Sequence, residues 1–201
     1  LILAKILVPE TEESKTKNTT DIEITQTASN VVEAAANGAS EGLGLALNVA
    51  AMLLAFVALI ALLNYILGKF GGLIGFQDLS FQWILGKIFS PLTFVMGIPV
   101  QDLGPAGSLL GQKVMINEFV AYSELSKYIA AGTLQPKTIL ILTYALCGFA
   151  NISSVAIQIG GIGSLAPEKK GLIAKLGFKA LLGGALATCL TGTIAGILFS
   201  I

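Results

Sequence analysis

Residues 90–132 read SPLTFVMGIPVQDLGPAGSLLGQKVMINEFVAYSELSKYIAAG. Prolines, glycines and the polar pairs Gln112-Lys113 and Asn117-Glu118 interrupt it, so neither apolar half is long enough to cross a hydrocarbon core of about 30 Å. Irregular backbone at membrane depth is tolerated only where it is buried in protein or lines a cavity. We therefore predict a re-entrant helical hairpin that enters the membrane, turns near Gly111 and returns.

The composition around this stretch is that of a membrane protein. Of the 201 residues, 54% are hydrophobic and only 12% are charged, and the mean hydropathy is +0.82. No charged residue lies between Glu41 and Lys69, between Lys137 and Glu168, or after Lys179. Each window holds the roughly 20 apolar residues that a spanning helix needs. A soluble protein with a very apolar core is the alternative, but its helices rarely run so long without a charged flank. We predict an all-α integral membrane protein.

The ionisable residues exclude several classes of function. Twelve lysines balance twelve acidic residues, and the sequence contains neither arginine nor histidine. It therefore offers no basic surface for nucleic acid, and it lacks the commonest general base and metal ligand. We expect no nucleic-acid partner, no metal site, no cofactor, no catalytic residue and hence no enzyme. Cys147 and Cys189 lie in apolar runs without CxxC spacing and are typical of small core residues.

Changes in polarity divide the chain into six segments. In order, these are the end of a transmembrane helix (1–8), a polar linker (9–30), an interfacial helix leading into a long transmembrane helix (31–69), an interfacial helix followed by the hairpin (78–132), a broken transmembrane helix (136–165) and a C-terminal transmembrane helix (168–201). Residues 42–67 form the clearest span, ended by glycines. The broken helix contains GFANISS at 148–154, where a glycine and three polar residues predict unwound or kinked backbone.

Three polar side chains are candidates for binding a ligand. Glu118 is costly to insert in a membrane, by about 2.5 kcal/mol or more, and such residues usually mark a substrate or ion path; the alternative is that it lies in water at the hairpin mouth. Asn151 and Ser154 lie three residues apart, on one face if the segment is helical, where they alternatively bond neighbouring helices. A carboxylate, an amide and a hydroxyl together suit a ligand with several hydroxyl groups, such as a ribose.

Neighbouring residues have less specific roles. Phe149 either forms a flat wall for an aromatic ligand or packs in the core or against lipid. Asn117 is expected to cap the second half of the hairpin, and Ser153 to point away from Asn151 and bond its own backbone.

These motifs resemble those of the concentrative nucleoside transporter family. The resemblance covers essentially the whole chain and is carried, in the family's order, by GLGLALN at 42–48, NEFVAY at 117–122, ALCGFANISS at 145–154 and GGIGSL at 160–165. It implies an inverted-repeat, elevator-type transporter with a re-entrant hairpin and a discontinuous transmembrane helix in each repeat, assembled as a homotrimer. It also implies that Glu118, Asn151 and Ser154 contact the ribose, and that Phe149 and Leu45 pack against the nucleobase.

The function implied is ion-coupled symport of nucleosides such as uridine across the lipid bilayer, with sodium favoured over protons. The family takes its coupling-ion ligands from a first hairpin and its partner helix, which this sequence does not contain, so the coupling ion is expected to bind outside this segment. We expect a bacterial inner membrane location. Alternatives are an ion channel, a transporter of another small polar solute, a membrane enzyme with Glu118 as acid or base, and a purely structural subunit.

Overall fold

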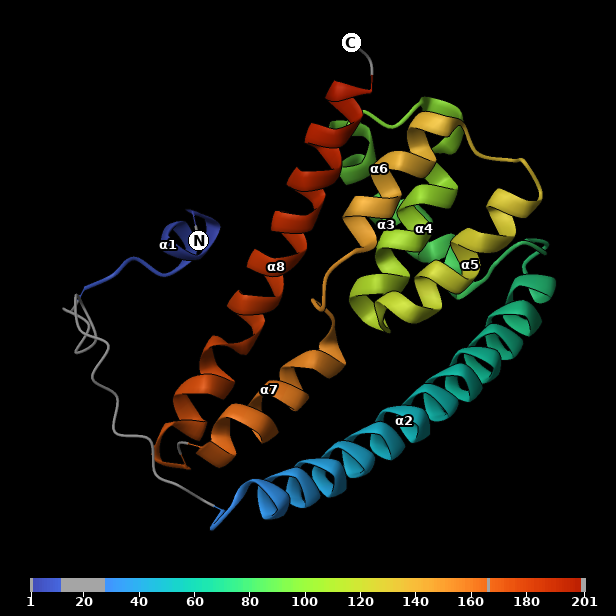
Figure 1. Cartoon of the computed structure of the whole chain (residues 1–201). Helices are drawn as coiled ribbons and strands as arrows, with labels where there is room; N and C mark the ends of the chain where they lie inside the picture. The colour runs from blue at the N-terminus through green and yellow to red at the C-terminus, as the bar shows by residue number, and fades with distance from the viewer. Residues whose placement is uncertain (1, 12–27, 166, 200–201) are drawn as a thin grey trace. The chain divides into compact units, whose positions relative to one another are not determined.

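The computed structural model describes residues 2–11, 28–165 and 167–199, and its regular elements are helices (Figure 1). In chain order they are α1 (Ile2–Leu7), α2 (Val31–Leu73), α3 (Phe81–Val95), the short turn η1 (Val100–Asp102), α4 (Leu103–Met115), α5 (Glu118–Ala130), α6 (Pro136–Leu146), α7 (Ile152–Leu165), the short turn η2 (Pro167–Lys169) and α8 (Lys170–Leu198). They divide into two compact units, residues 10–65 in one and residues 1–9 with 66–201 in the other.

Helix α2 is continuous over 43 residues. At 1.5 Å per residue it is about 65 Å long, roughly twice the thickness of a hydrocarbon core. The interfacial helix predicted before residue 42 and the span predicted over 42–67 are joined in it without a break, because the alanine-rich segment before residue 42 favours helix. Most of the predicted polar linker, residues 12–27, lies outside the described residues.

The end of α2 is set by a tight turn. The glycine pair that was expected to end the helix lies within its last turn, and the helix ends at Leu73, two residues before Gly75 with its φ of 76°. The N–H of Phe76 donates to the carbonyl of Gly71 at 2.7 Å. A Cβ at Gly71 would lie 2.9 Å from the Cβ of Leu79 and closer still to the carbonyl oxygen of Phe76. Gly71 therefore allows the chain to fold back along the helix end.

The interrupted stretch folds into the helical hairpin of α4 and α5, with α3 packed against α4. Its turn lies at Ile116 and Asn117, so the predicted turn near Gly111 is wrong. Gly111 is inside α4, where a Cβ would lie 2.7 Å from the Cβ of Leu85 in α3. The turn forms instead where Asn117 caps α5, its Oδ1 accepting the N–H of Val120 at 2.9 Å. The capping role predicted for Asn117 is confirmed.

Glycines bring α3 and α4 into backbone contact. A Cβ at Gly107 would lie 2.6 Å from the carbonyl oxygen of Gly86 and 2.9 Å from the nitrogen of Ser90. Gly107→Val is therefore expected to push the two helices apart and to cost about 1–3 kcal/mol of stability. The measurement is the thermal unfolding of the purified full-length protein in detergent. Gly104→Ala is the control, since a Cβ there would meet nothing within 4 Å; equal shifts for both variants would contradict this packing.

Polar contacts fix the hairpin against α6. Asp102, which is 3% exposed, accepts with Oδ2 the N–H of Gln135 at 3.0 Å and the hydroxyl of Thr138 at 2.5 Å. The hydroxyl of Tyr122 in α5 donates to the carbonyl of Thr143 in α6 at 2.6 Å. Both helices of the hairpin are thus attached to α6.

The hydrophobic core of this unit lies between α4, α5, α6 and α8. Glycines let α8 approach α6 closely: a Cβ at Gly192 would lie 2.6 Å from the carbonyl oxygen of Ile141, and one at Gly196 the same distance from its Cδ1. Small residues at these two positions allow the close packing that is common between transmembrane helices.

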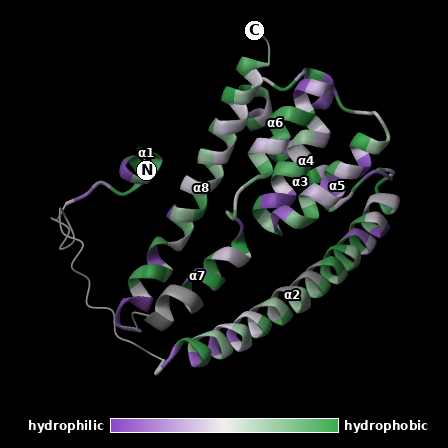
Figure 2. Cartoon of the chain, viewed as in Figure 1, coloured by the Kyte–Doolittle hydropathy of each residue, from purple (hydrophilic) through white to green (hydrophobic). Residues whose placement is uncertain are grey.

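Large apolar side chains along α8 are exposed. Large apolar side chains recur every four residues and are 41–66% exposed, at Phe178, Leu182, Leu186, Leu190 and Ile194. Hydrophobic residues recur along the whole helix in Figure 2. Among the described residues, Pro167–Leu198 is long and apolar enough to cross a membrane by length and composition. An exposed face of this kind is suited to lipid.

Candidate functional site

The chain unwinds between α6 and α7, at residues 147–151. Short turns close this break: the N–H of Gly148 donates to the carbonyl of Leu146, and that of Ala150 to the carbonyl of Gly148, both at 2.8 Å. A Cβ at Gly148 would lie 2.4 Å from Cγ2 of Thr188 in α8. Glycine therefore lets the break pass close to Thr188 of α8. The unwound backbone predicted within 148–154 lies at this place.

Asn151 caps α7 in a reciprocal arrangement with Ser154. Oδ1 of Asn151 accepts the N–H of Ser154 at 2.7 Å, while Oγ of Ser154 accepts the N–H of Asn151 at 3.2 Å and donates to its carbonyl at 2.7 Å. The side chains are buried, at 0% and 2% exposure. Asn151 precedes the helix rather than lying on its face with Ser154, because asparagine is a strong N-cap and ends the break.

Ser153 does not point away from Asn151, as the sequence suggested. Its hydroxyl donates to Oδ1 of Asn151 at 2.7 Å. Oδ1 therefore accepts two hydrogen bonds from α7, and the donor end of the amide, Nδ2, is turned outward from the cap.

Glu118 meets this donor. Nδ2 of Asn151 donates to Oε2 of Glu118 at 3.0 Å, a contact between residues 33 positions apart. Glu118 is the first residue of α5 and Asn151 caps α7, so the ends of two helices come together at the carboxylate. Helix N-termini carry a partial positive charge, which attracts a carboxylate.

The free hydrogen-bonding capacity of these groups defines what they can bind. Glu118 is half-buried and retains acceptor positions on both oxygens, while Asn151 retains one hydrogen on Nδ2. The hydroxyl proton of Ser154 is used by a backbone carbonyl, so Ser154 can only accept from a ligand. Two acceptors and a donor match the hydroxyl groups of a sugar, each of which both donates and accepts.

The two residues predicted to contact the nucleobase, Phe149 and Leu45, lie in different parts of the structure. Phe149 lies in the break, two residues before Asn151, and is 54% exposed, so it is not a core residue. Leu45 lies on α2, in the unit of residues 10–65, and its side chain lies outside the described part of the structure. The structure thus brings together Glu118, Asn151 and Ser154, with Phe149 beside them in the chain.

One buried side chain near this site was not predicted from the sequence. Lys113 of α4 is 1% exposed, and its Nζ donates to Oγ1 of Thr188 in α8 at 3.0 Å. The sequence feature that could have indicated this buried side chain is a single lysine in an apolar run, five residues before Glu118. Of the cysteines expected to be core residues, Cys189 is buried and Cys147, in the break, is exposed.

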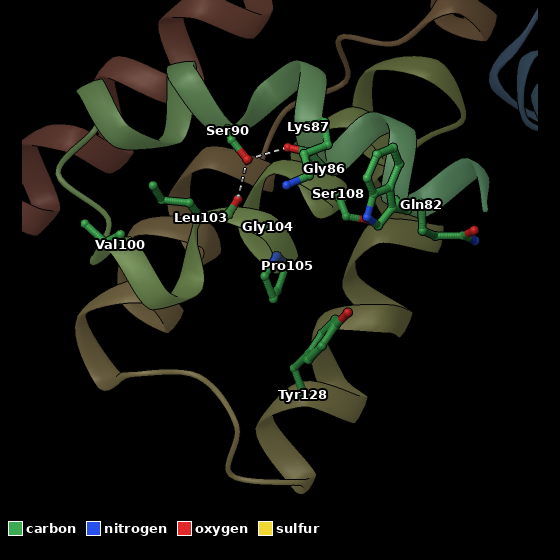
Figure 3. A pocket seen from close by; sticks show the side chains of 11 residues that line it. Gln82, Gly86, Lys87, Ser90, Val100, Leu103, Gly104, Pro105, Ser108 and Tyr128 are labelled. Carbon is green, nitrogen blue, oxygen red and sulfur yellow. Dashed lines mark hydrogen bonds between the residues drawn. The ribbon is translucent and has the colours of Figure 1, made fainter. Parts of the chain in front are cut away.

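A separate cavity of about 570 Å³ lies along α3 and α4 (Figure 3). Its walls include Trp83, Lys87 and Tyr128, and none of the predicted binding residues. The hydroxyl of Ser90 in its wall is directed to the carbonyl oxygens of Gly86 and Leu103. Among the described residues, no cluster of histidine, cysteine or acidic side chains fits a metal ion.

These features define the class of protein. The chain combines a long apolar helix, a helical hairpin and a broken helix, and the hairpin and the break meet at Glu118 and Asn151. This is the architecture of a helical membrane transporter. The chain belongs to the Na⁺-dependent nucleoside transporter family, because the model of that family's C-terminal region matches residues 1–196. The resemblance found in the sequence is confirmed, and so is the expectation that the chain is not an enzyme, since the family consists of transporters.

Named relatives come from bacteria and from animals. The chain is 50% identical over 198 residues to the uncharacterized transporter YutK of Bacillus subtilis, covering 98% of the chain and 48% of that protein. It is 48% identical over 200 residues to the nucleoside permease NupC of Helicobacter pylori, covering 98% and 47%. It is 38% identical over 213 residues to sodium/nucleoside cotransporter 1 of Sus scrofa, covering 99% and 33%.

Solved structures of the transporter CNTnw are similar throughout the chain. One, of a variant in an intermediate state, has a TM-score of 0.89 and 46% identity, covering 98% of this chain and 48% of that one. Another, in an inward-facing substrate-bound state, has a TM-score of 0.84 and 48% identity, covering 96% and 45%. The chain therefore spans about half of the length of its bacterial relatives and of these structures.

Proposed function

We propose that the protein containing this chain is a sodium-coupled nucleoside symporter. The observation that carries the proposal is the hydrogen bond between Glu118 and Asn151, which joins the hairpin to the helix break. The sodium/nucleoside cotransporter and the nucleoside permease among the relatives support the substrate class. The lipid-suited face of α8 supports a location in the membrane, and the bacterial relatives favour a bacterial inner membrane.

The nucleoside binds with its ribose at Glu118 and Asn151. Ribose hydroxyls donate to the carboxylate and accept from Nδ2 of Asn151, and Ser154 accepts one further hydrogen bond. The nucleobase packs against Phe149, whose exposure leaves its ring available, and against Leu45. Pyrimidine and purine nucleosides share the ribose, so these contacts recognise nucleosides as a class.

Transport follows an elevator-type alternating-access mechanism. The hairpin of α4 and α5 is re-entrant and moves with α6, because the contacts of Asp102 and Tyr122 tie them together. The long helix α2 belongs to the scaffold of a homotrimer, and an inverted repeat of the hairpin lies outside this segment. Solved structures of CNTnw in inward-facing, outward-facing and intermediate states support such a cycle in the family.

The coupling ion binds outside this segment and raises the affinity for the nucleoside. Linkage makes this effect reciprocal, so the nucleoside raises the affinity for the ion by the same factor. We expect saturable uptake of radiolabelled uridine into proteoliposomes of the full-length protein under an inward sodium gradient. Replacing sodium by choline is expected to abolish accumulation.

Other outcomes of this experiment discriminate the alternatives. Uptake driven by a proton gradient without sodium would change the coupling ion. Ion current without nucleoside, together with uptake that does not saturate, would indicate a channel. Absence of uridine and adenosine uptake under both gradients would overturn nucleoside transport and favour another polar solute.

A further inference from the structure

The orientation of the Asn151 amide decides what the candidate site offers to a ligand. Its Nδ2 donates to Oε2 of Glu118 at 3.0 Å and keeps one further hydrogen for a ligand. The terminal torsion of an asparagine is broad and roughly two-fold, so its own rotamer does not hold the amide in one plane. A reversed amide would present its oxygen to the carboxylate, acceptor against acceptor. The neighbouring groups therefore have to fix the plane of the amide.

Two donors meet at the oxygen of this amide. The N–H of Ser154 donates to Oδ1 at 2.7 Å, which is the bond that caps α7. The hydroxyl of Ser153 donates to the same oxygen at 2.7 Å. Hydrogen atoms bonded to a carbonyl oxygen prefer to lie near the plane of its group, so two donors restrain that plane more than one does. The cap needs only Ser154, and the bond from Ser153 is additional to it.

The hydroxyl of Ser153 differs in its partner from other hydroxyls in the helices. Ser153 is the second residue of α7 and is half-buried. Serine and threonine in helices commonly bond the backbone of the preceding turn, as Ser126 of α5 and Thr191 of α8 do at 2.7 and 3.0 Å. Ser153 bonds a side chain instead, the one whose other end contacts Glu118 of the hairpin.

We propose that Ser153 is a positioning residue for nucleoside binding, whose hydroxyl fixes the plane of the Asn151 amide and so directs Nδ2 toward Glu118 and the ribose. Ser153 acts through Asn151 and donates no hydrogen bond to the ligand, because its proton is used by Oδ1. The inference rests on the proposed function of Glu118 and Asn151 as ribose-binding residues.

Ser153→Ala tests the inference, because it removes the hydroxyl and leaves the cap bond from Ser154. The full-length protein is assayed for uridine uptake in proteoliposomes, with KM and maximal velocity determined separately. We expect KM to rise about fivefold, the order of effect for one neutral hydrogen bond, with the maximal velocity and the melting temperature retained. Ser153→Thr keeps the hydroxyl and is expected to keep KM close to that of the wild type.

Ser126→Ala is the matched control. It is the same substitution in α5, and the hydroxyl that it removes donates only to the carbonyl of Ser123 in its own helix. KM should remain unchanged. The inference is wrong if Ser153→Ala leaves KM unchanged, or if Ser153→Thr raises KM as much as Ser153→Ala does.

A double-mutant cycle shows whether Ser153 acts through the amide. In the Asn151→Ala background the amide is absent, so adding Ser153→Ala should change uptake at subsaturating uridine by less than about twofold, since groups that act as one unit are not additive. A further loss as large as in the wild-type background would mean that Ser153 acts without Asn151, and would overturn the inference.

Ser153→Cys keeps the inference testable if Ser153→Ala does not fold. The thiol occupies nearly the same place and is a weaker donor, so KM should rise in the same direction by a smaller factor, and an unchanged KM would contradict the inference. The proposed function fails separately: the wild-type protein would then take up no uridine, or Glu118→Gln would transport normally.

Discussion

Glu118→Gln is expected to lower uridine uptake at subsaturating concentration by roughly 10- to 150-fold. Glutamine has nearly the same size but no charge, and hydrogen bonds to charged groups contribute about 1.5–3 kcal/mol against roughly 1 for neutral ones. Glutamine replaces one carboxylate oxygen by an NH2 group, so one hydrogen bond from a ribose hydroxyl to the charged carboxylate is lost. Each 1.4 kcal/mol corresponds to a factor of ten in affinity, and the loss of that one bond gives the stated range. The measurement is the initial rate of radiolabelled uridine uptake by the full-length protein in proteoliposomes.

Glu124→Gln is the matched control for this substitution. Glu124 lies on the same helix, two turns further along, and its carboxylate pairs with Lys127 at 2.7 Å on the surface. Exposed pairs of this kind contribute little, so uptake should remain close to that of the wild type. Normal uridine uptake by Glu118→Gln would exclude Glu118 from the binding site.

The sequence predicts the helical composition, the hairpin and the break, because these depend on local patterns. Apolar runs interrupted by glycine, proline and polar pairs limit the length of a helix wherever they occur. Asn117 was predicted as a cap for the same reason, since capping involves only residues three positions apart. The hydrogen-bonding chemistry that makes Glu118 and Asn151 candidate binding residues also follows from their residue types.

Features that depend on contacts between distant helices were not predicted. The local sequence pattern predicts a turn at Gly111. In the structure Gly111 lies inside α4, where Leu85 of α3 leaves no room for a side chain. Lys113 was taken only as an interruption of an apolar run, because its partner Thr188 lies 75 residues away. Ser153 bonds the side chain of Asn151 because the break ends one residue before α7, a boundary that periodicity alone does not fix.

Asn151→Asp separates the two roles that the structure gives to Asn151. Aspartate caps helices as well as asparagine does, so the hydrogen bonds from Ser153 and Ser154 to Oδ1 should persist and α7 should keep its start. The donor Nδ2, however, is replaced by a carboxylate oxygen that faces Glu118 across about the same 3.0 Å. Two carboxylates at this distance repel or must share a proton, and neither then serves a ribose hydroxyl as the wild-type pair does.

We therefore expect Asn151→Asp to melt close to the wild-type temperature in detergent and to lose uridine uptake by roughly 100-fold or more, since one bond to a charged group is lost and a repulsion is added. Asn151→Ala is the comparison: it removes the cap, at about 1 kcal/mol, as well as the donor, and should lower both stability and uptake. If Asn151→Asp transported uridine normally while Asn151→Ala did not, the role of Asn151 would be capping alone. Loss of uptake at unchanged stability instead shows that transport needs the Nδ2 donor facing Glu118 and not only the cap, because capping is the one function that the two side chains share.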